Sequence, residues 1–359
     1  MMHVLQRHFV LFLLCTTGIL FFMTSVLVHM SRPRNPFANQ TACKLIRLPS
    51  SSAQSTSRKQ IHIVYSREAA AEANPSRIPL AERAQRICTT FPNIYEHRHN
   101  LKSTTAGDML QEIYRTHNHL LLATNPVNGR RLLYCSIPKV GNTSLKTFLL
   151  GLDKRHIGKY TDDSLHYYIR TVMGLPRLLK QKLVNASTIN KTFKVMFVRH
   201  PFERLVSFFL DKGRRNTRTG NHFYHTYWNK AMVKARGGKV DTKKDVIKFS
   251  EFVDIILTTK PSTYDLHWQL YSDRCKPCRV NYNFIGTLDD LHKMHELIGA
   301  KDERNLWKNK GPSNTNNATL VLFSQLPKSK VMKLYRIYYP DFLMFGFPID
   351  DYLSVAKSE

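Results

Sequence analysis

A loop rich in groups that bind phosphate lies between residues 135 and 146, where the chain reads CSIPKVGNTSLK. It follows an apolar run and precedes a helical pattern, and N–H groups at a helix start bind phosphate with the help of the helix dipole. Lys139 adds a positive charge, and Gly141 lets the backbone approach a ligand closely. A loop with a stray lysine is the alternative. The predicted phosphate-binding residues are Lys139, Val140, Gly141, Asn142, Thr143 and Ser144.

The order of residues in this loop differs from that of a Walker loop. A Walker loop reads G-x-x-x-x-G-K-[ST], with the lysine next to the hydroxyl residue that holds magnesium. Here Lys139 precedes Gly141. An ordinary ATPase or kinase is therefore disfavoured, although a nucleotide-dependent kinase stays as an alternative.

A second candidate phosphate site lies sixty residues further on. Arg199 ends an apolar run, and Ser207 follows eight residues later in a helical pattern. If the two apolar runs are neighbouring strands, Arg199 and Ser207 share a sheet edge with Lys139, and ligands bind at the carboxyl ends of such strands. Two phosphate sites at one edge predict a nucleotide phosphorylated at two separate positions.

Strands and helices alternate around these residues. Pro201 suits the first turn of a helix, and Gly213 is a plausible stop. The alternation predicts an α/β fold with a mostly parallel sheet flanked by helices. The predicted strands are 131–137 and 193–198, and the predicted helices are 109–123, 144–152, 202–212, 248–257 and 328–338, while 214–244 stays unassigned.

The composition is that of a folded, strongly basic protein. The 359 residues include 54 Lys and Arg against 26 Asp and Glu, giving a formal net charge of +28, and 42% are hydrophobic. Global disorder is excluded. The charge indicates a polyanionic partner, either nucleic acid, a lipid surface, or an acidic polymer or cofactor, with a merely solvated basic surface as the alternative.

The amino terminus indicates the compartment. Residues 9–28 form an uncharged run long enough to span a bilayer, so we expect an uncleaved signal anchor, with a cleaved signal peptide as the alternative. Residues 1–8 are then a cytoplasmic tail, the Pro- and Ser-containing residues 29–86 a stem, and residues 87–359 a lumenal domain. A lumenal body disfavours nucleic acid as the partner. The candidate glycosylation sites are Asn39, Asn185, Asn190 and Asn317, whereas Asn142, inside the phosphate loop, is expected to carry no glycan.

The cysteines offer one short motif. Cys275 and Cys278 form a C-x-x-C pair, for which an oxidising lumen favours a short-loop disulfide. A redox or zinc role is the alternative. The partners of Cys43 and Cys88 stay open.

The pairing of IPKVGNTSLK with FVRHPFERLVSFFLDK resembles the Golgi carbohydrate sulfotransferases, in particular the chondroitin and dermatan 4-O-, GalNAc 4-O- and HNK-1 group. His267-Trp268, the C-x-x-C pair, residues 281–286 and residues 335–347 match later segments of that family, so the likeness covers roughly 87–347. It implies the fold of sulfotransferases that use 3′-phosphoadenosine 5′-phosphosulfate (PAPS). If the roles of the family's residues are carried over, the 5′-phosphosulfate is held by Lys139, Asn142, Thr143 and Ser144, and the 3′-phosphate by Arg199 and Ser207.

The resemblance also implies a function and a place. We expect a PAPS-dependent carbohydrate O-sulfotransferase in the Golgi membrane, single-pass and type II, acting on an acidic glycan and needing no metal. The expected position is O-4 of GalNAc in chondroitin or dermatan. Glucuronic acid O-3 of HNK-1 type, GalNAc O-4 of N-glycans, and an inactive glycan-binding protein are the alternatives. Leu145, Leu266 and Asn283 depart from the family pattern and leave the acceptor open. The oligomeric state is open as well, a homodimer included.

Sulfuryl transfer demands in-line geometry and charge stabilisation at the leaving oxygen. Lys139 is predicted to supply that charge. His267 is predicted to be the general base for the acceptor hydroxyl, with a structural histidine beside Trp268 as the alternative and Asp265 and Glu203 as weaker candidates. The aromatic residues Tyr224, Tyr227 and Trp228 are predicted to form a core cluster, with stacking on sugar rings as the alternative.

Overall fold

The computed structural model describes most of the chain from residue 78 onward. The described residues are 78–92, 113–115, 117–153, 162–213, 222–238, 240–241, 244–299 and 315–359. The predicted tail, signal anchor and most of the stem, together with Asn39 and Cys43, lie outside them. Among the helices that are described, none is both long enough and apolar enough to cross a membrane.

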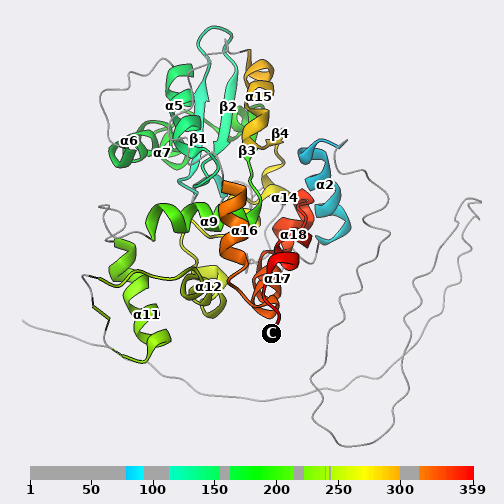
Figure 1. The fold of residues 1–359 in the computed structure, drawn as a ribbon. Coiled ribbons are helices and arrows are strands. Elements are labelled where there is room, and N and C mark those ends of the chain that lie inside the picture. The colour runs from blue at the N-terminus through cyan, green and yellow to red at the C-terminus, as the bar shows by residue number, and fades with distance from the viewer. Residues whose placement is uncertain are drawn as a thin grey trace, which may run out of the picture. The chain divides into compact units, whose positions relative to one another are not determined.

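A four-stranded sheet with the order β1-β2-β3-β4 forms the centre of the fold (Figure 1). Its strands are β1 (Leu120–Thr124), β2 (Arg131–Cys135), β3 (Phe193–Phe197) and β4 (Phe284–Gly286). β2, β3 and β4 run parallel, and β1 pairs antiparallel with β2 at one edge. The expected sheet flanked by helices is therefore confirmed, with an antiparallel edge strand added.

The predicted helix 109–123 is wrong over its second half. Residues 113–115 are helical, but Leu120–Thr124 is β1, which forms a hairpin with β2 through a turn containing Asn128 and Gly129. Leu120 to Ala123 are all at most 3% exposed. A short apolar run buried on both faces carries no strand periodicity, so it imitates a helix. Gly129 has a φ of 68°, and an Asn-Gly pair is the hairpin signal that identifies the turn.

Helices surround the sheet. Those after β2 include α5, which starts directly at the end of the loop, and α6 and α7, which pack with it against β1. The helices between β2 and β4 are α5 (Asn142–Leu152), α6 (Asp162–Met173), α7 (Leu175–Lys180), α8 (Ala186–Asn190), α9 (Pro201–Lys212), α11 (Asn229–Arg236), α12 (Phe249–Thr258), α13 (Tyr271–Cys275) and α14 (Pro277–Val280). Short 3-10 turns are Pro261–Thr263 and Leu288–Asp290, and Tyr224–Trp228 is a π-helical turn. The remaining helices are α2 (Leu80–Thr90), α15 (Leu291–Ile298), α16 (Thr315–Phe323), α17 (Lys328–Phe345) and α18 (Asp350–Val355).

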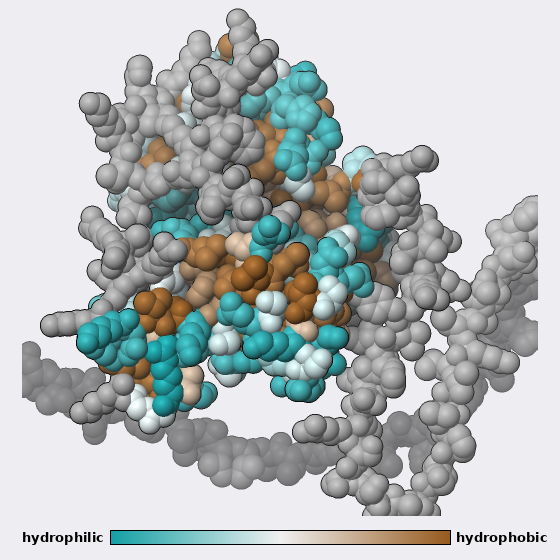
Figure 2. Space-filling model, viewed as in Figure 1, coloured by the Kyte–Doolittle hydropathy of each residue, from teal (hydrophilic) through white to brown (hydrophobic). Residues whose placement is uncertain are grey.

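A second apolar core lies beside the sheet, where α9, α12, α16, α17 and α18 pack together. Tyr224 and Trp228 are 3% and 1% exposed and belong to this core, so the core interpretation of these two rings is confirmed. The predicted helix 328–338 extends to Phe345 through Pro340, because Tyr338, Phe342 and Phe345 are buried along it. Figure 2 shows apolar residues around α16 on the viewed face, where Val321 is 60% exposed.

The cysteine prediction is wrong in its pairing. Two disulfides form, Cys135–Cys275 and Cys88–Cys278, with Cα–Cα distances of 6.0 and 5.4 Å. Lys276, with a φ of 49°, separates α13 from α14 and turns the chain between the two cysteines. Cys275 therefore reaches the end of β2, and Cys278 reaches α2. The Cys88–Cys278 bond attaches α2 to the core. This helix spans the predicted stem boundary at residue 87.

Candidate active site

The loop from Ser136 to Gly141 connects the carboxyl end of β2 to the start of α5. Lys139 and Gly141 have φ values of 70° and 76°. The backbone conformation of Gly141 favours glycine, and a Cβ there would lie 2.4 Å from Leu288 Cδ2, so that side chain would have to move. No side chain caps α5 at its first turn. The N–H groups there and the helix dipole are therefore directed at whatever lies in the loop.

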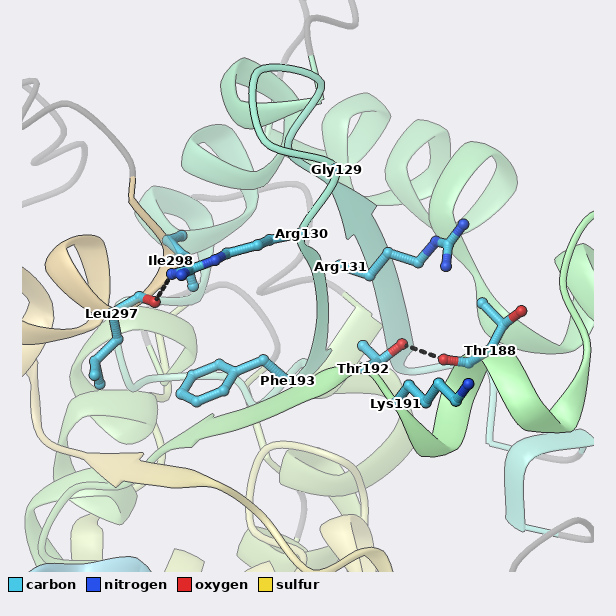
Figure 3. Close-up of a pocket in the computed structure, with 9 residues that line it drawn as sticks. All are labelled: Gly129, Arg130, Arg131, Thr188, Lys191, Thr192, Phe193, Leu297 and Ile298. Carbon is cyan, nitrogen blue, oxygen red and sulfur yellow. Dashed lines mark hydrogen bonds between the residues drawn. The ribbon is translucent and has the colours of Figure 1, made fainter.

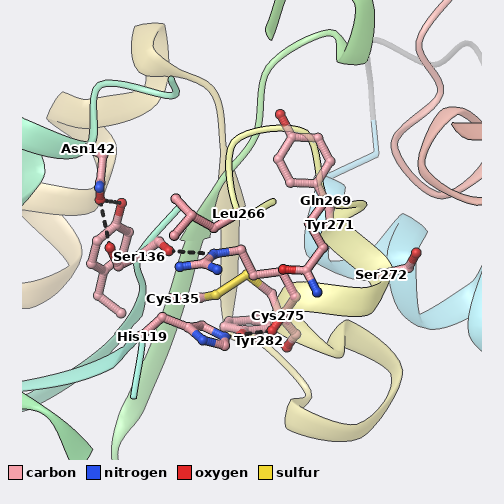
Figure 4. The surroundings of a disulfide bond; sticks show 12 residues. His119, Cys135, Ser136, Asn142, Leu266, Gln269, Tyr271, Ser272, Cys275 and Tyr282 are labelled. Atoms are coloured by element: carbon pink, nitrogen blue, oxygen red, sulfur yellow. Dashed lines mark hydrogen bonds between the residues drawn. A yellow bond between two sulfur atoms is a disulfide. The ribbon is translucent and has the colours of Figure 1, made fainter. Parts of the chain in front are cut away.

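Asn142 is part of the loop's internal support. Its Oδ1 accepts hydrogen bonds from Tyr134 Oη and Ser136 Oγ, both at 3.0 Å (Figure 4). Val140 is fully buried and Ser144 is 2% exposed, whereas Thr143 is half-buried. Of the predicted loop residues, Lys139 and Thr143 thus keep partly exposed side chains for a ligand, whereas Val140 and Ser144 are buried.

One face of α9 contacts both predicted phosphate-binding cations. Lys139 Nζ lies 2.9 Å from Asp211 Oδ2, and Arg199 Nε lies 3.0 Å from Glu203 Oε2. Glu203, Ser207 and Asp211 follow one another at intervals of four residues, so they form one row on the helix, with Ser207 in the middle. Glu203 and Asp211 are about 12 Å apart along the axis at 1.5 Å per residue. Lys139 and Arg199 therefore lie at the two ends of one row of side chains.

The backbone of Arg199 is held from the interior. The buried hydroxyl of Tyr271 accepts from Arg199 N–H at 3.0 Å and donates to Arg199 O at 2.8 Å. Asp341, fully buried, accepts from the N–H groups of Tyr271 and Ser272 at 2.7 and 3.0 Å and so caps α13. Burial raises the pKa of Asp341 to about 6, although these two hydrogen bonds oppose the shift. Asp341 thus supports Tyr271, which in turn holds the backbone of Arg199.

Two arginines that are not among the predicted site residues, the buried Arg204 and the partly buried Arg274, hold the loop from behind. Arg204, 2% exposed, donates to the carbonyl oxygens of Pro138, Leu266 and Gln269 at 3.2, 3.0 and 2.7 Å. Arg274 Nε donates to Ser136 O at 2.8 Å. The loop, α9 and the segment before α13 are joined through these bonds. Glu203, one of the weaker base candidates, pairs with Arg199.

His267 lies against α9 with an acidic partner. Its Nδ1 is 2.6 Å from Asp265 Oδ1, and its ring stacks on Phe208 with centroids 4.9 Å apart. Burial lowers the pKa of His267, and the charges of Arg204 and Lys139 lower it further, while Asp265 opposes them. Burial would raise the pKa of Asp265, but the bond and charge of His267 hold it below its usual value. A neutral imidazole held by a carboxylate near Lys139 is an arrangement suited to accept a proton at Nε2.

A cavity of about 300 Å³ lies elsewhere, at the amino ends of β2 and β3 (Figure 3). Arg131 and Phe193, the first residues of those strands, line it, together with Lys191. The loop is at the carboxyl end of β2. This cavity is therefore at the opposite edge of the sheet and is not part of the candidate active site.

Comparison with known proteins identifies the family. Residues 121–348, more than half of the chain, match the model of the sulfotransferase family. The chain belongs to the sulfotransferase family. The match begins in β1 and ends just past α17, so it includes the loop, α9 and the His267 segment.

Individual relatives agree with this assignment. Carbohydrate sulfotransferase 9 of Homo sapiens is 28% identical over 280 residues, covering 73% of this chain and 58% of that protein. Carbohydrate sulfotransferase 8 of Mus musculus is 31% identical, covering 60% of this chain and 54% of that protein. Carbohydrate sulfotransferase 11 of Danio rerio is 25% identical, covering 94% and 92%. The chain thus spans between about half and two thirds of the first relatives it matches. No solved structure matches it.

The structure brings Lys139 and Arg199 to one face of α9, which also carries Ser207, while their roles stay predictions. Within the described residues, no group of three or more His, Cys, Asp or Glu is placed to hold a metal ion. The family implies PAPS as the sulfate donor. The chemistry of the site fits such a ligand, since a lysine, an arginine and an uncapped helix start offer donors and positive charge to an anion, although Asp211 and Glu203 pair with the two cations in this structure.

Proposed function

We propose that this protein is a carbohydrate O-sulfotransferase that uses PAPS as its donor. The observation that supports it most is the row on α9, where Lys139 and Arg199 stand at the two ends and Ser207 between them. An adenosine that carries a phosphosulfate at one end and a phosphate at the other needs two separate anion-binding sites at one edge of the sheet. The uncapped start of α5 adds N–H donors to the anion-binding site at Lys139.

The proposed roles follow from position. Lys139 stabilises the charge that develops on the leaving phosphate oxygen as the S–O bond breaks. Thr143 and the N–H groups of residues 140–144 bind the 5′ end, and Arg199 and Ser207 bind the 3′-phosphate. His267, oriented by Asp265, takes the proton of the acceptor hydroxyl as its oxygen bonds to sulfur. PAPS would supply the sulfuryl group, and the chain supplies the charge, the orientation and the base.

The finer statements about acceptor and place are part of the same proposal. The relatives are named carbohydrate sulfotransferases, which favours a glycan acceptor. We propose O-4 of GalNAc in chondroitin or dermatan, with HNK-1-type glucuronic acid O-3 and N-glycan GalNAc O-4 as alternatives. The uncharged run at residues 9–28 supports a type II Golgi membrane protein. Lys139 and Arg199 belong to one chain, so a homodimer is not needed for donor binding.

Two measurements on the purified full-length protein test the proposal. The protein should be retained on immobilised 3′,5′-bisphosphoadenosine (PAP) and released by PAP but not by ATP, which separates it from a kinase. It should then transfer radiolabelled sulfate from PAPS to desulfated chondroitin, with disaccharide analysis giving the position. Retention without transfer to any of a panel of defined glycans would instead support an inactive glycan-binding protein.

A further inference from the structure

Lys146 is a buried cation that the proposed mechanism does not use. It lies on α5, one turn after Asn142, and is 4% exposed. Its Nζ is 3.2 Å from Nδ1 of His166 on α6. In the described part of the chain, Lys146 has no carboxylate within ion-pair distance. A buried ammonium without a carboxylate is costly, because it loses hydration and gains no opposite charge.

The surroundings of Lys146 are positive as well. Arg170 follows His166 by one turn on α6, and its Nε donates to the backbone oxygen of His166. Arg274 lies close enough for its charge to act on Lys146. Burial, and then the charges of Arg170 and Arg274, lower the pKa of Lys146 to about 7. Lys146, Arg170 and Arg274 thus form a positive cluster.

A separate observation concerns Thr147, which lies on the same helix. The hydroxyl of Thr147 is buried and has no hydrogen-bond partner among the described residues. Thr147 is one turn after Thr143, just as Lys146 is one turn after Asn142. Buried polar groups are nearly always satisfied, whereas α5 carries two buried polar groups, consecutive in the sequence, whose bonding capacity the described residues leave partly unused.

One member of the cluster, Arg274, also interacts with the surroundings of the proposed base. Arg274 interacts electrostatically with Arg170 and also with Asp265, the partner of His267. The same arginine donates to Ser136 O at the start of the loop. Arg274 thus links the electrostatics of the cluster to both the donor loop and the Asp265–His267 pair.

We propose that Lys146, His166 and Arg170 form an anion subsite that binds the carboxylate of a hexuronate next to the sugar that receives sulfate. The proposal rests on the proposed function and names its acceptor as a uronate-containing glycan. A carboxylate has four lone-pair positions and accepts from ammonium, imidazolium and guanidinium donors together. It would neutralise Lys146.

The test compares two forms of one oligosaccharide. Binding of a desulfated chondroitin hexasaccharide and of its carboxyl-reduced form is measured by calorimetry on the full-length protein, with and without PAP. The wild type should bind the carboxylate form about tenfold more tightly or better, as expected for charge-assisted hydrogen bonds. In the Lys146→Met and Arg170→Ala variants this preference should fall to nearly one, while PAP affinity stays unchanged.

Matched controls keep the result interpretable. Lys194→Met removes another buried lysine, 8% exposed, whose Nζ bonds to the carbonyl oxygens of Asn190 and Thr192, and it should keep the full preference. Arg170 is exposed, so its variant tests the subsite even if Lys146→Met fails to fold. Equal wild-type binding of both oligosaccharides, or a preference that survives in Arg170→Ala, would overturn the subsite. Absence of PAP binding would overturn the donor site instead.

Discussion

The ammonium group of Lys139 lies 2.9 Å from Oδ2 of Asp211, on the last turn of α9. Lys212 contacts the same carboxylate at 3.3 Å. Burial would raise the pKa of Asp211, but the hydrogen bond and charge of Lys139, and the charge of Lys212, hold it below its usual value. Without donor, Lys139 is thus neutralised by the helix that also carries Ser207. A donor phosphate that binds Lys139 must either share this ammonium group with Asp211 or displace the Asp211 carboxylate from it.

Replacement of Asp211 by Asn should therefore tighten PAP binding. The pair is 20% and 40% exposed, so solvent screens it, and we expect a gain of about twofold to fivefold in affinity at 0.1 M salt. Calorimetric titration with PAP measures it. The matched control is Asp254→Asn on α12, which breaks an ion pair of 2.8 Å with Lys330. This variant should leave the PAP affinity unchanged. Weaker PAP binding in Asp211→Asn would show that Asp211 positions Lys139 for the donor and does not compete with it.

Replacement of Lys139 by Met should nearly abolish sulfate transfer. Loss of one preorganised electrostatic donor costs roughly 10²–10³ in rate. The initial rate of transfer from radiolabelled PAPS, at saturating donor, measures it, and Lys330→Met is the control for loss of a paired lysine. Turnover close to wild type would remove Lys139 from the mechanism.

The two strand–loop–helix units could be predicted because their signals are local. Each has an apolar run, a loop with a marked glycine or proline, and a helix, and β2, α5, β3 and α9 were found within two residues of their bounds. β1 was missed because Leu120 to Ala123 are buried on both faces and show no alternation. Cysteine pairing was missed because proximity along the chain says nothing about which face a side chain takes.

The residues that hold the site in place were harder to predict from the sequence than the cations of the site. Arg204 donates to Pro138 O across 66 residues, and Arg274 to Ser136 O across 138. Both act on backbone carbonyl oxygens, which every residue carries, so no residue type marks the acceptor. Arg204 stands in the segment that resembles the family, and only its burial shows that it faces inward.

Replacement of Asp265 by Asn should change the pH profile of transfer. Burial lowers the pKa of His267, and the carboxylate of Asp265 opposes that shift. Protonation of His267 removes the base, so kcat/KM should fall as pH drops below the pKa of His267, which lies under 6.5. Without the carboxylate this pKa drops further, so the acid limb should move to lower pH, and kcat should fall because the ring loses its orientation.

The control for this profile is Asp254→Asn, which leaves His267 untouched. Rates are measured from pH 5 to 8 at saturating PAPS. An acid limb that is identical in wild type and Asp265→Asn, with unchanged kcat, would assign His267 a structural role beside Trp268.

Removal of the two disulfides should have different effects. Cys135 precedes Ser136, so the Cys135→Ser, Cys275→Ser double variant should lose about 2–5 kcal/mol of stability and most of its activity. The Cys88→Ser, Cys278→Ser double variant releases α2 and should lose stability but keep its kcat when folded. Unfolding in urea and initial rates measure both. Peptide mapping without reductant that finds a Cys275–Cys278 bond would contradict the pairing.

Replacement of Arg204 by Lys tests whether the guanidinium holds the loop. Lysine keeps the charge but cannot reach the carbonyl oxygens of Pro138, Leu266 and Gln269 together, since its donors radiate from one nitrogen. Leaving buried carbonyl groups unpaired costs about 1–3 kcal/mol each, so we expect a loss of about 2–4 kcal/mol in the free energy of unfolding. Transfer should fall by about tenfold or more, because the Pro138 and Leu266 segments carry Lys139 and His267. Arg86→Lys, in the exposed pair with Glu82, is the control. If Arg204→Lys kept the stability and turnover of the wild type, the three bonds would not be what positions the loop.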